Sequence, residues 1–373
     1  MARLTLNDIA RQVGCSKNTV SLALRGDRQI SATTRDRVRQ TAAELGYQPN
    51  AVISHLMAQL RASRSVNLQA KLALVNASRD PLAFRAHPAV LTQVTGCESR
   101  AAQLGYGFDR FWLHDPALNA SRWLRILHTR GIKGLVLVGL TDTNRLPGDM
   151  RPVWAQLPTV VAGVRTREPG LPFCCVDYHN LMLTAIERAL ALGYRRPGLV
   201  IDDGADALVE WRLSGGYLAS QRTLPRSQHL PVFTPSTGGP GEPPGFRAWL
   251  EAHQPDVIFT LEDRLVTWLT GAGLRVPRDV GIVQLDWRAG RAEMAGMNQN
   301  GFATGAATVD LVVSQIHGNE TGIQESPRAT LVSATWMDGP SVRRPPQPRQ
   351  QGQGTEEPSA RGASTAVAGA AAG

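Results

Sequence analysis

The 373-residue sequence lacks the features of a membrane protein or of a secreted, disulfide-bonded one. No stretch approaches the roughly 18 consecutive apolar residues of a membrane span. The N-terminus carries polar or charged residues every few positions, where a signal peptide would be apolar. The four cysteines show no metal-ligand spacing, and the adjacent pair Cys174 and Cys175 is poorly suited to a disulfide. We therefore expect a cytoplasmic protein that binds no metal.

Sequence signatures of catalysis are also missing. The chain has no G-x-S-x-G, no P-loop, no H-E-x-x-H and no dinucleotide-binding glycine motif after a strand. The histidines in the body of the chain, such as His179 and His253, stand in loop-like or helix-end contexts without spaced partners. The pair Asp202-Asp203 after a predicted strand is more typical of a turn than of a metal site. We expect neither an enzymatic activity nor a cofactor.

The chain does have the composition of a globular protein and an uneven distribution of charge. Hydrophobic residues make up 42% and charged residues 19%, which suits a sizeable core, and the length suits two or three domains. The net charge is +9, and residues 1–65 contain ten basic against four acidic residues. Most of the excess positive charge therefore lies in the first sixth of the chain, which favours a polyanionic partner for that segment.

Residues 4–47 predict three short helices. Apolar residues recur at helical spacing in Leu6–Val13. Ser16 and Ser31 are good N-caps for a second and a third helix, and Gly46 is placed to end the third. This arrangement is typical of a helix-turn-helix unit, whose second helix enters the major groove of DNA.

The start of the second helix carries side chains suited to reading bases. Lys17 can donate to guanine acceptors, Asn18 can bond an adenine bidentately, and Leu22 follows one turn later on the exposed side. Short hydroxyl side chains stand near the helix starts, where backbone N–H groups also favour phosphate: Thr5, Ser16, Thr19, Ser21, Ser31 and Thr34. The alternative is a small three-helix domain with an ordinary solvated face, and the basic excess weighs against it.

From end to end, this head resembles that of the lactose-repressor (LacI-type) family of transcriptional regulators. The matching residues run from Leu4-Thr-Leu-Asn-Asp-Ile-Ala through Gly14-Cys-Ser-Lys-Asn-Thr-Val-Ser21 to Leu45-Gly46-Tyr47-Gln48-Pro49-Asn50. The resemblance implies that Lys17 and Asn18 are the principal base-reading residues and that Ser16, Thr19 and Ser21 contact the DNA backbone. Two positions differ from the family pattern: Leu22 stands where many members carry Arg, which favours an apolar contact such as one to a thymine methyl, and Arg25 stands where Asn is usual, which would add a phosphate contact.

The same resemblance implies a hinge after the head. Tyr47 and Asn50 would lead into a hinge helix, 50–57, that forms on the DNA. There Leu56 would wedge into the minor groove, which unstacks a base step and bends the duplex. The alternative is that Leu56 is a linker residue or packs on the core. Ile53-Ser54 replaces the usual Ala-Arg pair of the hinge.

From about residue 68, short apolar runs alternate with amphipathic stretches. Such alternation implies parallel sheets with right-handed crossovers, and about 270 residues of it suit two sheets better than one. The expected strands are 72–76, 107–113, 134–138, 159–164, 198–201, 257–260, 281–285 and 330–333. The expected helices lie around 89–104, 119–130, 180–192, 211–222, 263–273 and 302–316.

This body resembles the periplasmic-binding-protein-like sensor domain of the same family through shorter matches, among them Ala191-Leu-Gly-Tyr-Arg-Arg and Gly281-Ile-Val-Gln-Leu-Asp286. The fold class we expect is thus an all-α helix-turn-helix head plus an α/β sensor of two lobes with parallel sheets. The resemblance implies that three crossing strands join the lobes and that a ligand binds between the carboxyl ends of the facing sheets.

Strand ends supply most candidates for effector contacts. They are Asn76, Asp80, Trp211, Arg212, Asp263, Asp286 and Trp287. Carboxylates and guanidinium groups hydrogen-bond hydroxyls, and an indole offers an apolar face to a sugar ring, so the set suits a sugar or polyol. Asp263 has an alternative role as a helix N-cap, and Trp287 has one in core packing.

The end of the chain bears on assembly. Residues 340–373 contain no Leu, Ile, Phe, Trp or Tyr, so we expect a disordered tail without a tetramerising leucine heptad. We predict a homodimer on double-stranded operator DNA, with the apolar face of the helix at 302–316 contributing to the dimer interface. The predicted domains are 1–49, 50–67, 68–339 and 340–373. The alternative function is a solute-binding sensor without specific DNA binding.

Overall fold

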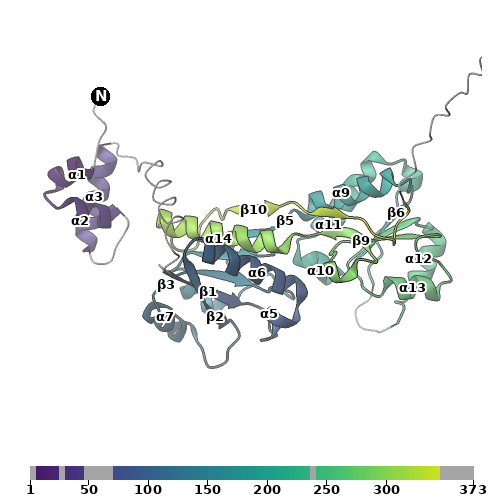
Figure 1. Cartoon of the computed structure of the whole chain (residues 1–373), viewed down its shortest axis with the longest axis horizontal. Coiled ribbons are helices and arrows are strands. Elements are labelled where there is room, and N and C mark those ends of the chain that lie inside the picture. The colour runs from purple at the N-terminus through teal and green to yellow at the C-terminus, as the bar shows by residue number, and fades with distance from the viewer. Residues whose placement is uncertain (1–5, 25–29, 46–69, 236–240, 345–373) are drawn as a thin grey trace, which may run out of the picture.

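The computed structural model describes residues 6–24, 30–45, 70–235 and 241–344, which form a small helical head and a larger α/β body (Figure 1). The head contains α1 (Leu6–Val13), α2 (Lys17–Leu24) and α3 (Ala32–Glu44). These are the three helices that the sequence predicts. Apolar residues of all three close one small core: Ile9, Ala10, Val13, Val20, Ala23, Val38 and Ala42.

The first lobe of the body is built on a six-stranded sheet in the order β10-β5-β4-β3-β1-β2, with every described pairing parallel. Its strands are β1 (Ala70–Asn76), β2 (Tyr106–Trp112), β3 (Ile132–Val138), β4 (Thr159–Ala162), β5 (Phe173–Val176) and β10 (Ala329–Val332). Its helices are α5 (Ala83–Ala86), α6 (Pro88–Gln103), α7 (Ala120–Thr129), α8 (Arg151–Trp154) and α14 (Gly301–Gly318). Helices α6 and α14 cover one face of the sheet, and α7 and α8 contribute to the core on the other.

The second lobe has a five-stranded sheet in the order β11-β9-β8-β7-β6, parallel except for the antiparallel β11. Its strands are β6 (Pro197–Val200), β7 (Val257–Thr260), β8 (Gly281–Gln284), β9 (Ala295–Asn298) and β11 (Thr335–Met337). Its helices are α9 (Tyr178–Ala191), α10 (Asp203–Leu208), α11 (Arg212–Ser220), α12 (Phe246–His253) and α13 (Leu265–Gly271). The expected α/β body of two lobes with parallel sheets is confirmed.

The chain passes between the lobes three times, after β5, after β9 and after β10. The crossings are bonded to one another. The backbone N–H of Asp177 donates to the carbonyl of Val332, and the side-chain amide of Asn300 donates to the carbonyl of Ser333 and to the hydroxyl of Thr335. The three crossings therefore form one hydrogen-bonded junction between the lobes.

The predicted strands are present with shifts of one or two residues, but β5, β9 and β11 were missed. Each is only three or four residues long, and β9 (Ala-Gly-Met-Asn) has little of the β-branched or aromatic character that marks a strand. Their pairing depends on neighbouring strands that lie far away in the sequence. The short helices α5, α8, α10 and α12 were missed too.

Two further expectations are wrong. Val309 and Val313 of α14 lie in the core of the first lobe, because the apolar face of this helix packs on the sheet and on α6, so that face cannot form a dimer interface. The body also extends past residue 339. Ser341 and Val342 are buried against the second lobe, and the Ser341 hydroxyl accepts from the N–H of Ala295 and donates to the carbonyl of Ile282.

Candidate DNA-reading head and effector cleft

The hydroxyl side chains of the head act first as helix caps. Ser16 Oγ accepts from the backbone N–H of Thr19 at 3.0 Å, and Ser31 Oγ accepts from the N–H of Thr34 at 3.3 Å. The hydroxyls of Ser16 and Thr19 are also hydrogen-bonded to each other at 2.8 Å, and those of Ser31 and Thr34 at 2.9 Å. The two predicted N-caps are confirmed. Ser16 and Ser31 remain exposed, so their helix starts are open to solvent on the side where phosphate would approach.

The predicted base readers lie on α2. Lys17 begins this helix, and Leu22, which is partly exposed, lies in its second half. Arg37 on α3 fixes the three-helix arrangement by donating to the carbonyl of Val13 at 2.8 Å. For Lys17, Asn18 and Ser21 the structure describes the backbone but not the side chain. The other predicted contacts lie wholly outside the described residues: Thr5, Arg25, Tyr47, Asn50 and Leu56.

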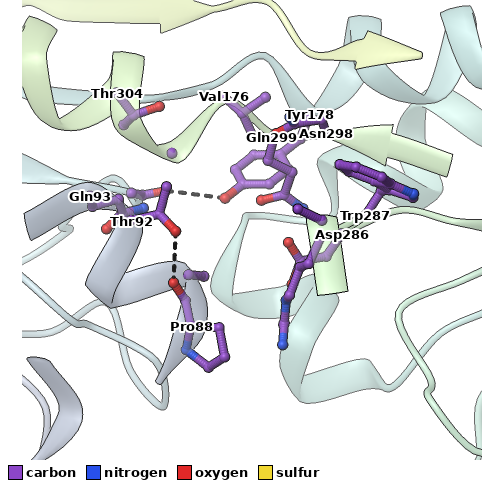
Figure 2. A pocket seen from close by; sticks show the side chains of 15 residues that line it. Pro88, Thr92, Gln93, Val176, Tyr178, Asp286, Trp287, Asn298, Gln299 and Thr304 are labelled. Atoms are coloured by element: carbon purple, nitrogen blue, oxygen red, sulfur yellow. Dashed lines mark hydrogen bonds and ion pairs between the residues drawn. The ribbon is translucent and has the colours of Figure 1, made fainter. Parts of the chain in front are cut away.

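In the body, a pocket of about 240 Å³ lies where the carboxyl ends of the two sheets face each other (Figure 2). Pro88, Thr92 and Gln93 enter it from the start of α6, and Asp286 and Trp287 enter it from the loop after β8. The full lining is Pro88, Ala89, Thr92, Gln93, Gly163, Val176, Tyr178, Asp286, Trp287, Arg288, Ala289, Asn298, Gln299, Gly301 and Thr304. The pocket thus takes residues from both lobes and from the segments that join them.

Two glycines bring α6 and α14 close enough to form one wall of this pocket. A Cβ on Gly305 would lie 2.0 Å from the carbonyl oxygen of Gln93, and a Cβ on Gly96 would lie 2.0 Å from the carbonyl oxygen of Phe302. Only glycine fits at either position without moving backbone. The close crossing is what places Gln93 and Thr304 on the same wall.

The polar groups of the pocket are held by specific partners. Asp286 is paired with the guanidinium group of Arg288 from two residues away. The hydroxyl of Tyr178 donates to the carbonyl of Gly163 at 3.2 Å, and burial raises the pKa of this phenol well above its ordinary value, so Tyr178 is a neutral donor and acceptor. The side-chain amide of Gln299 donates to the carbonyl of Leu285 at 2.9 Å, which leaves its oxygen available. The pocket therefore presents fixed donors and acceptors with a single, neutralised ion pair.

Trp287 both packs on the core and lines the pocket. Its indole N–H donates to the carbonyl of Met294 at 2.9 Å, and its ring packs against the core of the second lobe. It also lines the pocket. The indole is therefore a rigid apolar wall whose polar atom is already satisfied.

Three other predicted effector residues do not line this pocket. Asn76 is buried, and its side-chain amide donates to the backbone carbonyls of Asp80 and Pro81, so it closes the turn after β1. Asp80 accepts from the backbone N–H of Leu82 in the same turn. Asp263 is held in a bidentate ion pair by Arg291 and does not cap a helix in this structure.

Trp211 and Arg212 lie in a separate part of the cleft, at the start of α11. Arg212 donates to Glu210 at 2.7 Å and contacts the Cys175 sulfur at 3.6 Å, and its guanidinium group lies over the ring of Phe173. Burial raises the pKa of the Cys175 thiol to about 11, although the charge of Arg212 opposes this, so the sulfur is an uncharged contact. Cys175 directly precedes Val176, which lines the pocket, on β5.

Most residues that line the pocket were not predicted from the sequence. Tyr178, Asn298, Gln299, Thr92, Gln93 and Thr304 were not predicted. A signal existed for Tyr178, because it follows the strand end at Val176-Asp177, but strand β5 itself was not recognised. The others lie at helix starts or at the end of β9, which only the fold brings to the cleft.

Comparison with known proteins identifies the head. Residues 5–50 match the family model described as "Bacterial regulatory proteins, lacI family". The matched segment contains α1 to α3. The head is therefore similar to the DNA-binding domain of the lacI family of bacterial regulatory proteins, and the resemblance seen in the head residues is confirmed.

Curated relatives extend the likeness from the head into the body. The HTH-type transcriptional regulator PtxS of Pseudomonas putida is 26% identical over 291 residues, covering 76% of this chain and 80% of that protein. The lactose operon repressor of Escherichia coli is 24% identical over 298 residues, covering 77% of this chain and 76% of that repressor. Both alignments are too long to be confined to the head.

Solved structures share the fold of the chain. One is titled as a complex of the transcriptional regulator CelR with cellobiose; it has a TM-score of 0.53 and 22% identity and covers 91% of this chain and 100% of that one. Another is titled as the lac repressor dimer bound to operator and the anti-inducer ONPF; it has a TM-score of 0.52 and 19% identity and covers 92% and 100% of the two chains. At these identities the structures establish the fold. In the described part of the chain, no helix is long and apolar enough to cross a bilayer.

Proposed function

We propose that this LacI-family regulator binds a near-palindromic operator as a homodimer and that a small polyhydroxy effector in the pocket between its lobes sets its operator affinity. The observation that carries the proposal is the pocket itself, which takes residues from both lobes in a chain with a lacI-type head. A ligand that contacts both lobes stabilises one relative position of the lobes over others. That differential affinity is what a ligand-controlled switch requires.

The chemistry of the pocket supports a neutral, hydroxyl-rich ligand part. Carboxamides, hydroxyls and one paired carboxylate can each donate to or accept from a sugar hydroxyl, and Trp287 offers an apolar wall. The volume of about 240 Å³ is below the ~300–1,000 Å³ of pockets for drug-sized ligands, so it suits one sugar ring rather than two. The structure titled as a CelR–cellobiose complex supports a carbohydrate ligand for a protein of this fold.

In the proposed DNA complex, Lys17, Asn18 and Leu22 face base edges from α2. Arg25 and the hydroxyls of Thr5, Ser16, Thr19, Ser21, Ser31 and Thr34 contact the DNA backbone. Tyr47 and Asn50 lead into the hinge, where Leu56 of each protomer meets the minor groove. We assign the head to residues 1–49, the hinge to 50–67 and the sensor to the body from residue 68.

The test is selection of bound fragments from genomic DNA by the purified full-length protein. We expect a shared inverted repeat of roughly 14–20 base pairs, because a two-fold dimer places two recognition helices about one helical turn apart. Binding that depends on salt but not on sequence would contradict the proposal. Genes beside the selected sites would then name candidate effectors, and effector and operator should weaken or strengthen each other's binding reciprocally.

A further inference from the structure

Three guanidinium groups in the cleft converge on a single carboxylate. Glu210 Oε2 lies 2.7 Å from Arg212 Nη2 and 3.8 Å from Arg165 Nη1, and Glu210 Oε1 lies 3.3 Å from Arg167 Nε. In the part of the chain that the structure describes, these arginines form no ion pair with a second carboxylate. The arginine cluster (Arg165, Arg167 and Arg212 with Glu210) therefore carries a net charge of +2.

The arginine cluster is built from both lobes. Arg165 and Arg167 lie in the loop after β4 of the first lobe, whereas Glu210 lies between α10 and α11 of the second lobe and Arg212 begins α11. An anion bound among them would join the lobes more firmly than Glu210 alone, because it would add charge-assisted hydrogen bonds to both sides of the cleft. Of the three ion pairs, the two that join the lobes have the longer N–O distances: Arg165–Glu210 and Arg167–Glu210.

Glu210 leaves much of the bonding capacity of the cluster unused. Each guanidinium group has five N–H donors, while one carboxylate offers two oxygens. Glu210 is only 15% exposed, but the side chains of Arg165 and Arg167 are 52% and 44% exposed, so both remain accessible to a dissolved anion. Burial on its own raises the pKa of Glu210, yet the hydrogen bond from Arg212 and the neighbouring charges hold that pKa below its ordinary value.

The backbone beside the cluster is an independent sign of a ligand site. Glu210 and Trp211 are consecutive non-glycine residues with φ of +62° and +55°, a strained conformation that concentrates at functional sites. The turn is held by Asp206, whose carbonyl accepts from the N–H of Trp211 at 2.8 Å. Trp211 is left 49% exposed, with Arg167 over its ring at 6.0 Å.

We propose that the arginine cluster binds an anionic group of the effector, a carboxylate or a phosphate, and that Glu210 takes the place of this group in the unliganded protein. The exposed indole of Trp211 covers the carbon skeleton next to the anion. The hydroxyl-bearing part of the same molecule extends toward the pocket between the lobes, whose lining includes Val176, the residue after the Cys175 that Arg212 contacts. The inference rests on the proposed effector cleft and makes its ligand an acidic or phosphorylated sugar.

Inorganic phosphate and acetate test the site without knowledge of the sugar. Each is titrated into the full-length protein by calorimetry at constant ionic strength, with glucose as the neutral probe. The variants are the double variant Arg165→Gln/Arg167→Gln, Glu210→Gln, and Arg275→Gln as the matched control. Arg275 is paired with Asp279 on the surface of the second lobe, so its loss changes the net charge without touching the cluster. Phosphate binding by the head is the same in all variants and cancels.

We expect the double variant to weaken anion binding at least tenfold, Glu210→Gln to strengthen it several-fold, and Arg275→Gln to leave it unchanged. Tighter binding of phosphate than of acetate assigns a phosphate ester, and the reverse assigns a carboxylic acid. Equal anion binding by the wild type, the double variant and Glu210→Gln would overturn the inference and leave Glu210 as an ion pair between lobes. Operator selection by the same variants without any anion tests the proposed function separately.

Discussion

The guanidinium group of Arg167 and the carboxylate of Glu210 lie 3.3 Å apart across the cleft, one from each lobe. Since Arg167 is 44% exposed, solvent screens this pair, and its own contribution to stability is on the order of 0–1 kcal/mol. Its importance is positional. The pair is one of the few described contacts that an entering ligand could replace on both lobes at once.

The first prediction concerns the acid sensitivity of this carboxylate. The pKa of Glu210 is lowered in the folded protein from an ordinary value of 4.5, so its stabilising effect is fully present above pH 4.5 and is lost as the pH falls through the lower folded value. The difference in unfolding free energy between wild type and Glu210→Gln should therefore be constant from neutral pH down to about pH 5 and shrink below it. Urea denaturation of both proteins across this range measures it. A difference that does not change with pH would mean that the charge of Glu210 contributes nothing.

The second prediction concerns base reading. The double variant Lys17→Ala/Asn18→Ala should lose discrimination between operator and unrelated DNA while keeping salt-dependent, non-specific binding. Each good base contact contributes about 1–3 kcal/mol of discrimination, so the loss of two contacts is expected to cost about 2–6 kcal/mol, or roughly 30- to 25,000-fold. Gln40→Ala, an exposed change on α3, is the control. Competition binding measurements in which the double variant retains full discrimination would contradict the assignment.

The third prediction concerns the crossing of α6 and α14. Gly305→Ala should destabilise the protein by about 1–3 kcal/mol, because the new methyl group would overlap the backbone oxygen of Gln93. Gly271→Ala, at the end of α13 with no atom within 4 Å of the added carbon, should be neutral or slightly stabilising. Chemical denaturation compares the two. If Gly305→Ala were as stable as Gly271→Ala, the close helix contact would not be a constraint on the pocket wall.

The fourth prediction concerns effector recognition. Asp286→Asn should weaken the effect of the ligand on the operator complex by roughly tenfold or more, since a hydrogen bond to a charged group contributes about 1.5–3 kcal/mol. Operator affinity without ligand should stay the same. Titration of the operator complex with a panel of neutral and acidic monosaccharides measures the response, and Asp279→Asn on the lobe surface is the control. An unaltered response in Asp286→Asn would exclude this carboxylate from the effector contacts.

The fifth prediction concerns assembly. Light scattering should give a mass near twice the 40.3 kDa of the chain, because residues 340–373 contain no leucine from which a tetramerising heptad could be built. A stable tetramer would show that another surface associates. The apolar face of α14 is not such a surface, since Val309 and Val313 are buried within their own lobe.

The three helices of the head could be predicted from the sequence. The helices and their serine caps lie within about 45 consecutive residues, and each depends on helical spacing or on a hydrogen bond to a residue three positions away. The alternation of strands and helices also identified a body with two parallel sheets, because that pattern repeats locally along the chain.

The composition of the cleft, in contrast, depends on long-range contacts. Pro88, Val176, Asp286 and Thr304 are far apart in the sequence, and they meet because the sheet order β10-β5-β4-β3-β1-β2 and the three crossings bring their elements together. Asp286 was predictable as the end of a recognisable strand. Arg165 and Arg167 were not, because an exposed arginine in a loop has no distinctive pattern until the opposite lobe places Glu210 against it.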